Sequence, residues 1–172
     1  GANYQLTIDH NGEKYVSTHV MRACPIIEDL GYDIITSLAE KDSTAIYEVV
    51  FSFRDIQGEG DAYYGVDYLK GTTVGDTLFN GDYTDDEFFD GQYFDEISLT
   101  EEDRLFTLGD TAVVEIFSIG KETFQFLIDI EQEVFRGGPF DPPPANIRSN
   151  ISNGAVGYFI ASGANRREIV IE

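Results

Sequence analysis

Apolar side chains occupy every second position from residue 45 to residue 53, and this alternation constrains the fold more than any other feature of the sequence. The series consists of Ala45, Tyr47, Val49, Phe51 and Phe53. Successive side chains of a β-strand point to opposite faces, so the whole series lies on one face of a sheet. Aromatic and β-branched residues also favour strands. The pattern therefore predicts a half-buried strand, and the apolar stretches at 63–70 and 111–120 predict two more.

The first twenty residues predict a β-hairpin. Apolar residues alternate in "YQLTID" on one side of a short turn and in "KYVSTHV" on the other. Asn11-Gly12 is a pair that a tight two-residue turn favours, because both residues tolerate a positive φ. Pro25 ends this unit, and residues 26–30 predict either a short helical turn or an edge segment. We expect the hairpin to belong to the main sheet.

Only residues 121–136 predict an α-helix, because Phe124, Leu127 and Ile128 recur there at helical spacing. We expect this helix to pack against the sheet. Gly137-Gly138 provides a stop signal, and four of the six residues from 139 to 144 are proline. Such a segment is neither helix nor central strand, and it favours an extended polyproline II arm.

The proline arm predicts a crossover that carries the chain from the helix to another edge of the sheet. Beyond it we expect two strands, at 155–162 and 167–172, separated by a turn at 163–165. The sequence as a whole predicts a single, mainly β domain over residues 1–172. Its expected fold is an antiparallel β-sandwich or a distorted barrel with one packed helix.

The charge balance excludes some partners. The 32 acidic residues outnumber the 11 basic ones and give a formal net charge of −21. Nucleic-acid binding requires clustered basic side chains, so we expect no nucleic-acid partner. The single Cys24 excludes an internal disulfide and a zinc site of several thiolates. We expect both histidines, His10 and His19, to lie on the surface.

Residues 71–103 form an acidic segment with interleaved aromatic side chains, for which we expect a long loop with one or two short strands. Its carboxylates could supply oxygen ligands to Ca²⁺, which would make calcium the one candidate cofactor. The candidate ligands are Asp82, Asp85 and Asp86. Their spacing differs from that of the helix-flanked calcium loop, and a solvated acidic loop is the alternative interpretation.

Four tyrosines form a candidate ligand-binding surface for a sugar or a peptide. They are Tyr63, Tyr64, Tyr68 and Tyr83. The alternative is that these rings border the core with their hydroxyl groups outward. A pair of carboxylates could in principle hydrolyse glycosides, but no spacing in the sequence supports such a pair. We therefore expect no catalytic residues and no enzyme activity.

The end of the chain resembles the C-terminal signature of a Bacteroidetes lipoprotein family, domain of unknown function 4249. The similar motifs are a proline-rich "PF" segment, "SNI" and "NGAVGYF". The opening "YQLTI…G…Y" followed by Pro25-Ile26-Ile27, and the "AYYGVDYL" block with its acidic "D…F(D)G" continuation, also resemble this family. The resemblance covers essentially the whole chain. The three consecutive prolines depart from the one or two usual in the family.

The resemblance implies a lipid-anchored protein of the outer membrane or cell surface, of which this chain is the C-terminal part. A lipoprotein signal and an upstream β domain would precede it, and the lipid anchor would be its only contact with the membrane. The resemblance supplies no catalytic residue. We expect a non-catalytic module that binds a small ligand, another surface protein or an outer-membrane receptor of the TonB-dependent class. A scaffolding role is the alternative, and a carboxylate-based glycoside hydrolase is a further one.

Overall fold

The computed structural model describes residues 1–35, 45–58, 63–70, 82–85, 89–98, 105–134 and 147–172, with only the backbone given for 63–70, Asp82 and Asp85. The strands in these ranges are β1 (Ala2–His10), β2 (Glu13–Met21), β3 (Ile27–Ile34), β4 (Tyr47–Arg54), β5 (Tyr63–Lys70), β6 (Asp82–Asp85), β7 (Tyr93–Ser98), β8 (Thr111–Ile119) and β9 (Ala164–Val170). The helix is α2 (Lys121–Val134), and all strand pairs are antiparallel. None of the helices in the described ranges is long and apolar enough to cross a membrane.

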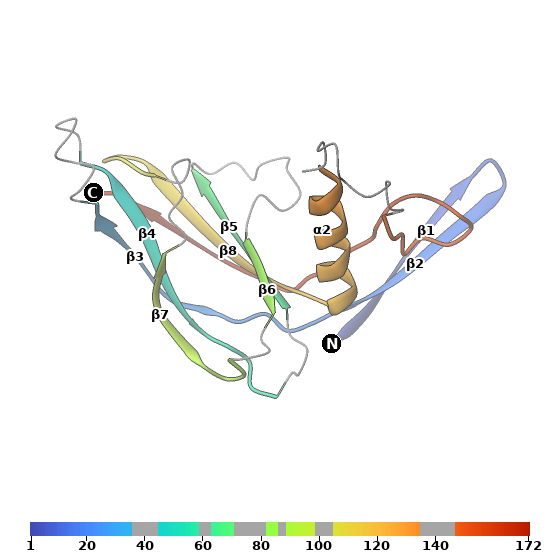
Figure 1. Ribbon diagram of the computed structural model, residues 1–172, viewed down its shortest axis with the longest axis horizontal. Coiled ribbons are helices and arrows are strands. Elements are labelled where there is room, and N and C mark those ends of the chain that lie inside the picture. Colours follow the sequence, from blue (N-terminus) through green and yellow to red (C-terminus); the bar gives the residue numbers. More distant parts are fainter. Residues whose placement is uncertain (36–44, 59–62, 71–81, 86–88, 99–104, 135–146) are drawn as a thin grey trace, which may run out of the picture.

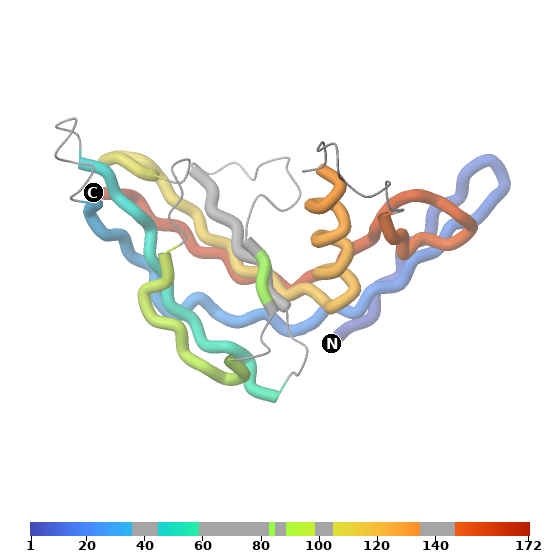
Figure 2. Tube along the Cα trace, in the orientation of Figure 1, coloured from blue at the N-terminus to red at the C-terminus, as the bar shows by residue number. Residues whose placement is uncertain are grey.

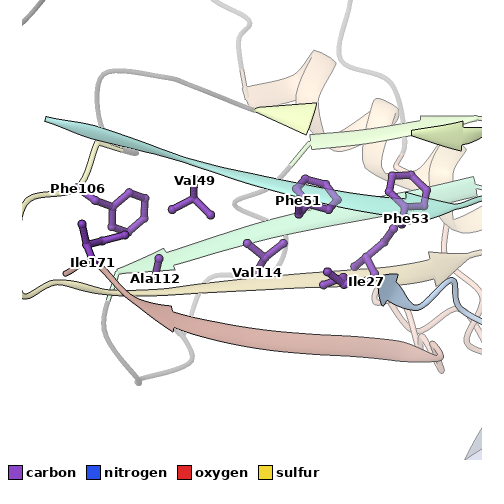
Figure 3. Packing of buried hydrophobic residues seen from close by; sticks show 9 residues of the cluster. Ile27, Val49, Phe51, Phe53, Phe106, Ala112, Val114 and Ile171 are labelled. Carbon is purple, nitrogen blue, oxygen red and sulfur yellow. The ribbon is translucent and has the colours of Figure 1, made fainter. Parts of the chain in front are cut away.

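Two sheets pack face to face and enclose the main core (Figure 1). One has the strand order β3-β4-β7 and the other β6-β5-β8-β9. Figure 3 shows the side chains between them, six of which come from alternate positions of β4 and β8. The cluster comprises Ile27, Val49, Phe51, Phe53, Phe106, Ala112, Val114, Ile116 and Ile171. The predicted mainly β sandwich is confirmed, including the face that the alternation at 45–53 defines; the sheets do not close into a barrel.

Strand β8 is buried on both faces. Its residues Ala112, Val114 and Ile116 face the other sheet, whereas Phe117 and Ile119 pack with Leu127 of α2. The helix thus forms a third layer, which confirms its predicted packing against the sheet. A strand covered on both sides needs apolar residues at nearly every position, and the sequence "AVVEIFSI" meets this requirement.

The hairpin β1–β2 forms a two-stranded sheet of its own, so the expectation that it joins the main sheet is wrong. Asn11 (φ 52°) and Gly12 (φ 82°) make the predicted turn. Figure 1 shows the hairpin extending away from the two sheets. Beyond Met21 the chain does not continue as a strand, because Pro25 lacks an N–H group and the Ser118 hydroxyl occupies the Ala23 carbonyl oxygen at 2.6 Å.

The last part of the chain corrects a second expectation. No strand forms at 155–162, and β9 already includes Ala164 and Asn165, which were expected in a turn. The expected pair of final strands is therefore reduced to one, β9, which supplies an edge of the sheet by pairing with β8. The irregular path of 155–162 has a physical reason, because side chains rather than a neighbouring strand satisfy its backbone groups.

The remaining predictions concern short segments. Of residues 26–30, all but the first belong to edge strand β3, and they form no helical turn. Within the acidic segment, β6 and β7 are the short strands expected. The proline arm at 139–146 lies outside the described residues, so its polyproline conformation stays a prediction.

Candidate functional site

The turn of the hairpin determines which backbone N–H and C=O groups bond between β1 and β2 and which point to the outer edges. Because Asn11 and Gly12 form a two-residue turn, His10 and Glu13 are the hydrogen-bonded pair that closes it. Hydrogen-bonded and non-hydrogen-bonded pairs alternate along an antiparallel ladder. Every second residue from His10 and Glu13 therefore directs its N–H and C=O groups into the hairpin. The residues between them direct these groups outward. Those of β1 point to one edge of the hairpin and those of β2 to the other.

Residues 147–163, which we call the covering segment, bond to outward groups of β2 at Lys14 and Val16. The Val16 N–H donates to Ser152 Oγ at 2.8 Å, and the Ser152 N–H donates to the Val16 carbonyl oxygen at 2.9 Å. Asn153 Nδ2 donates to the Lys14 carbonyl oxygen at 2.6 Å. Figure 2 shows this part of the chain beside the hairpin. The covering segment thus satisfies both outward groups of Val16 and the carbonyl oxygen of Lys14 without a third strand.

The covering segment holds its own shape through short polar side chains. The Asn150 amide bonds to both backbone groups of Phe159, with Nδ2 donating to its carbonyl oxygen at 2.7 Å and Oδ1 accepting from its N–H at 2.8 Å. Ser149 Oγ lies 2.7 Å from the carbonyl oxygens of Ala155 and Gly157. The "SNI" and "NGAVGYF" motifs of the sequence therefore build a closed loop.

Helix α2 anchors this loop on its other side. Arg148 approaches Asp129 with Nε and Nη2, at 2.5 and 3.3 Å, and its Nη1 donates to Gln125 Oε1 at 2.6 Å. The ring of Tyr158 stacks on Phe126 with centroids 4.1 Å apart, and burial raises the pKa of the Tyr158 phenol. The helix consequently lies between the sheet and the covering segment.

His19 of β2 lies where the hairpin, α2 and the covering segment meet. Its Nε2 is 2.9 Å from Thr123 Oγ1, and its Nδ1 is 3.0 Å from the Ala161 carbonyl oxygen. The side chain is only 8% exposed, so the expectation of a surface histidine is wrong for His19. A signal for burial was present in the sequence, because in the paired hairpin His19 shares a strand face with Tyr4, Leu6 and Ile8.

The outward edge of β1, in contrast to that of β2, receives no hydrogen bonds from the described parts of the chain. Its outward backbone groups belong to Asn3, Gln5, Thr7 and Asp9. The neighbouring side chains of Tyr4 and Ile8 are 45% and 42% exposed. Tyr4 lies directly opposite the buried His19. The boundary between buried and exposed surface thus runs along the hairpin, between its two strands.

The hairpin also differs from the rest of the chain in charge. Residues 1–21 contain two of the 32 acidic residues, Asp9 and Glu13, together with Lys14. This region is therefore close to neutral in a chain with a net charge of −21. An open backbone edge, exposed apolar side chains and a low local charge coincide at β1.

The four candidate ligand-binding tyrosines lie in different settings. The Tyr83 hydroxyl donates to Glu131 Oε2 of α2 at 2.5 Å, and its ring meets Phe124 edge to face. Burial and Glu131 raise the Tyr83 pKa to about 12. This tyrosine therefore joins β6 to the helix. The other three tyrosines lie in β5, where Tyr63, Tyr64 and Tyr68 pair with Ile119, Ser118 and Val114 of β8. The structure describes only the backbone of these three tyrosines. Ligand binding by these residues stays a prediction.

The calcium prediction also stays untested. Asp82 and Asp85 contribute backbone to β6, and Asp86 lies outside the described residues. Among the residues that are described, no group of three or more His, Cys, Asp and Glu side chains is placed to hold a metal ion.

Cys24 belongs to the connection between the hairpin and the sandwich. Its Sγ donates to the Ile116 carbonyl oxygen at 3.0 Å, and burial raises the pKa of the thiol to about 12. Only the thiolate is a good nucleophile, so this cysteine is a structural rather than a reactive group.

Comparison with known proteins identifies the family of this chain. Residues 1–168 match the family described as Domain of unknown function (DUF4249), and the chain therefore belongs to that family. Neither the curated proteins nor the solved structures contain a match to this chain.

Proposed function

We propose that the protein is a non-catalytic, protein-binding module of an outer-membrane lipoprotein, and that its partner is a TonB-dependent receptor or another surface protein. One observation carries the binding role, namely the open edge of β1 beside the exposed side chains of Tyr4 and Ile8. The outer-membrane location and the class of partner come from the family resemblance.

An open edge of this kind supports partner binding because natural proteins normally protect such edges. They use lysine, proline, β-bulges or very short strands. Strand β1 is nine residues long, contains neither lysine nor proline, and keeps an unbroken register with β2 from Ala2 to His10. Its protection is therefore expected to come from a segment outside residues 1–172.

The test is a pull-down from an outer-membrane extract of the source organism, with the 172-residue chain immobilised. A double variant, Tyr4→Lys with Ile8→Lys, changes the two exposed apolar side chains of β1 without altering a buried one. The control is Val156→Lys, which alters a 95% exposed side chain of the covering segment.

We expect the wild-type chain and the Val156 variant to retain the same partner and the double variant to lose it. Equal retention by all three chains, or no protein retained above background, would contradict the proposal. Turnover of a glycan or peptide by the purified chain would contradict its non-catalytic part.

A further inference from the structure

We propose that a β-strand from outside residues 1–172 adds to the free edge of β1, and that this strand has apolar side chains at alternate positions and no acidic ones. The inference rests on the proposed partner-binding function and specifies its mode. It follows from three features of β1, which are its backbone groups, its side chains and its charge.

The backbone groups require an extended partner. Asn3, Gln5, Thr7 and Asp9 present N–H and C=O groups that no described residue bonds to, at every second residue, a spacing of roughly 6.6 Å along a strand. Another strand repeats donors and acceptors at the same spacing and can bond to the whole row. On the β2 edge, Ser152 and Asn153 supply partners for the outward groups of Val16 and for the Lys14 carbonyl oxygen, so polar groups from outside the hairpin do bond to such an edge.

The side chains of β1 require alternate apolar residues. Tyr4, Leu6 and Ile8 share one face with Ser17 and His19 of β2. The β2 half of this face is covered, since Ser17 and His19 are 3% and 8% exposed. The cover ends at β1, where Tyr4 and Ile8 remain exposed. Apolar side chains on an added strand would lie beside these residues and extend the covered surface.

The charge selects against an acidic strand. Asp9 is the only charged side chain of β1, and a like charge directly opposite it would be destabilising. A second copy of this chain has a suitable side-chain pattern, because antiparallel pairing centred on Leu6 would set Tyr4 against Ile8. Each copy, however, brings a net charge of −21, and the two would repel each other. A neutral or basic strand fits the edge better.

The experiment uses a synthetic nine-residue peptide in which valine alternates with lysine and threonine. Its binding to the 172-residue chain is measured by fluorescence anisotropy, and the binding site by hydrogen exchange. The variant Thr7→Pro removes one outward N–H group, whereas the inward groups of Leu6 and Ile8 that pair with β2 are unchanged. Thr7→Ala is the matched control, because it keeps the N–H group.

We expect the peptide to slow exchange at Asn3, Gln5 and Asp9, and Thr7→Pro to weaken binding by about tenfold, the equivalent of one hydrogen bond. Thr7→Ala should leave binding unchanged. A second probe guards against misfolding of the proline variant: the same peptide, N-methylated at the backbone positions facing β1, should bind the wild-type chain poorly.

Four results would overturn the inference. They are equal binding to the Thr7→Pro chain, equal binding of the N-methylated peptide, equal binding of a peptide with glutamate in place of lysine, and dimerisation of the chain through β1 in sedimentation. The proposed function is tested separately. If the Thr7→Pro chain still retained a membrane partner, strand addition would be wrong but the proposed function would still hold. If no chain retained a partner, the proposed function itself would be wrong.

Discussion

The sandwich and the hairpin use different physical means to stay folded. The sandwich buries fully enclosed apolar side chains such as Val114 and Ile116 of β8, a strand with neighbours on both edges and both faces. The hairpin depends on polar contacts from the covering segment and from Thr123 of α2, and among the described residues hydrogen bonds reach the outward groups of β2 but not those of β1. The region that folding leaves incomplete is the one available for a partner. We therefore attribute most of the stability to the sandwich, and the proposed recognition would fall to the hairpin.

The two edges of the hairpin repeat this contrast at a smaller scale. Both strands carry outward backbone groups in the same alternation, set by the same turn. Only β2 meets Ser152 and Asn153, whose short side chains reach its backbone. The difference between a partly covered and an open edge thus depends on a few residues more than 130 positions away in the sequence.

The contrast between sandwich and hairpin predicts that the largest loss of stability comes from a substitution in the sandwich core. Phe51 is 2% exposed and stacks on Phe53, so Phe51→Ala should lower the free energy of unfolding by about 3–5 kcal/mol. Leu6→Ala removes a half-buried apolar side chain from the hairpin and should cost only about 1 kcal/mol. Guanidinium denaturation followed by circular dichroism measures both. Equal losses would mean that the hairpin belongs to the same cooperative core.

A smaller effect is expected at the junction of the two regions. His19→Ala leaves Thr123 Oγ1 and the Ala161 carbonyl oxygen without this partner in a buried site, which should cost about 1–3 kcal/mol. Hydrogen exchange should accelerate in β2. His10→Ala, which alters the exposed histidine at the turn, is the control and should change stability little.

The reactivity of Cys24 shows whether the loss of stability in His19→Ala is confined to the junction. Its thiol has a pKa of about 12 and bonds to β8, so iodoacetamide should leave it unmodified while the sandwich is intact. Continued protection of Cys24 in the His19→Ala chain would support a separate junction. Rapid alkylation would show that the damage reaches the sandwich.

Local patterns in the sequence predict the elements of this fold better than their assembly. The alternation at 45–53 predicts both a strand and its buried face, and Asn11-Gly12 predicts the hairpin turn, because each depends on neighbouring residues. The strand expected at 155–162 was wrong for the opposite reason. Its backbone bonds go to Asn150 and His19, and tertiary contacts of this kind leave no periodic signal.

The candidate site shows the same limit. The alternation of Tyr4, Leu6 and Ile8 predicts an apolar strand face, but it does not tell which strand of the hairpin will be covered. Coverage depends on the path of the chain after the prolines, which brings Ser152 to β2 rather than to β1. The open edge could be recognised only once that path was known.

A substitution at the β2 edge is expected to have an intermediate effect on stability. Ser152→Ala removes the acceptor of the Val16 N–H group and should cost about 1 kcal/mol, since water can replace part of an exposed hydrogen bond. The Val16 amide should then exchange faster, which proton–deuterium exchange by NMR detects. Thr18→Ala, on the same strand with an exposed side chain, is the control. An unchanged Val16 amide would mean that the covering segment does not protect this edge.

The smallest effect is expected where the covering segment meets the helix. The ion pair between Arg148 and Asp129 is partly exposed, and such pairs contribute about 0.2–1 kcal/mol. A double-mutant cycle with Arg148→Met and Asp129→Asn should give a coupling in this range that shrinks in high salt, because ions screen exposed charges. A coupling of several kcal/mol, insensitive to salt, would mean that the covering segment is held as firmly as the sandwich core. In that case the contrast between a rigid body and a weakly held recognition hairpin would fail.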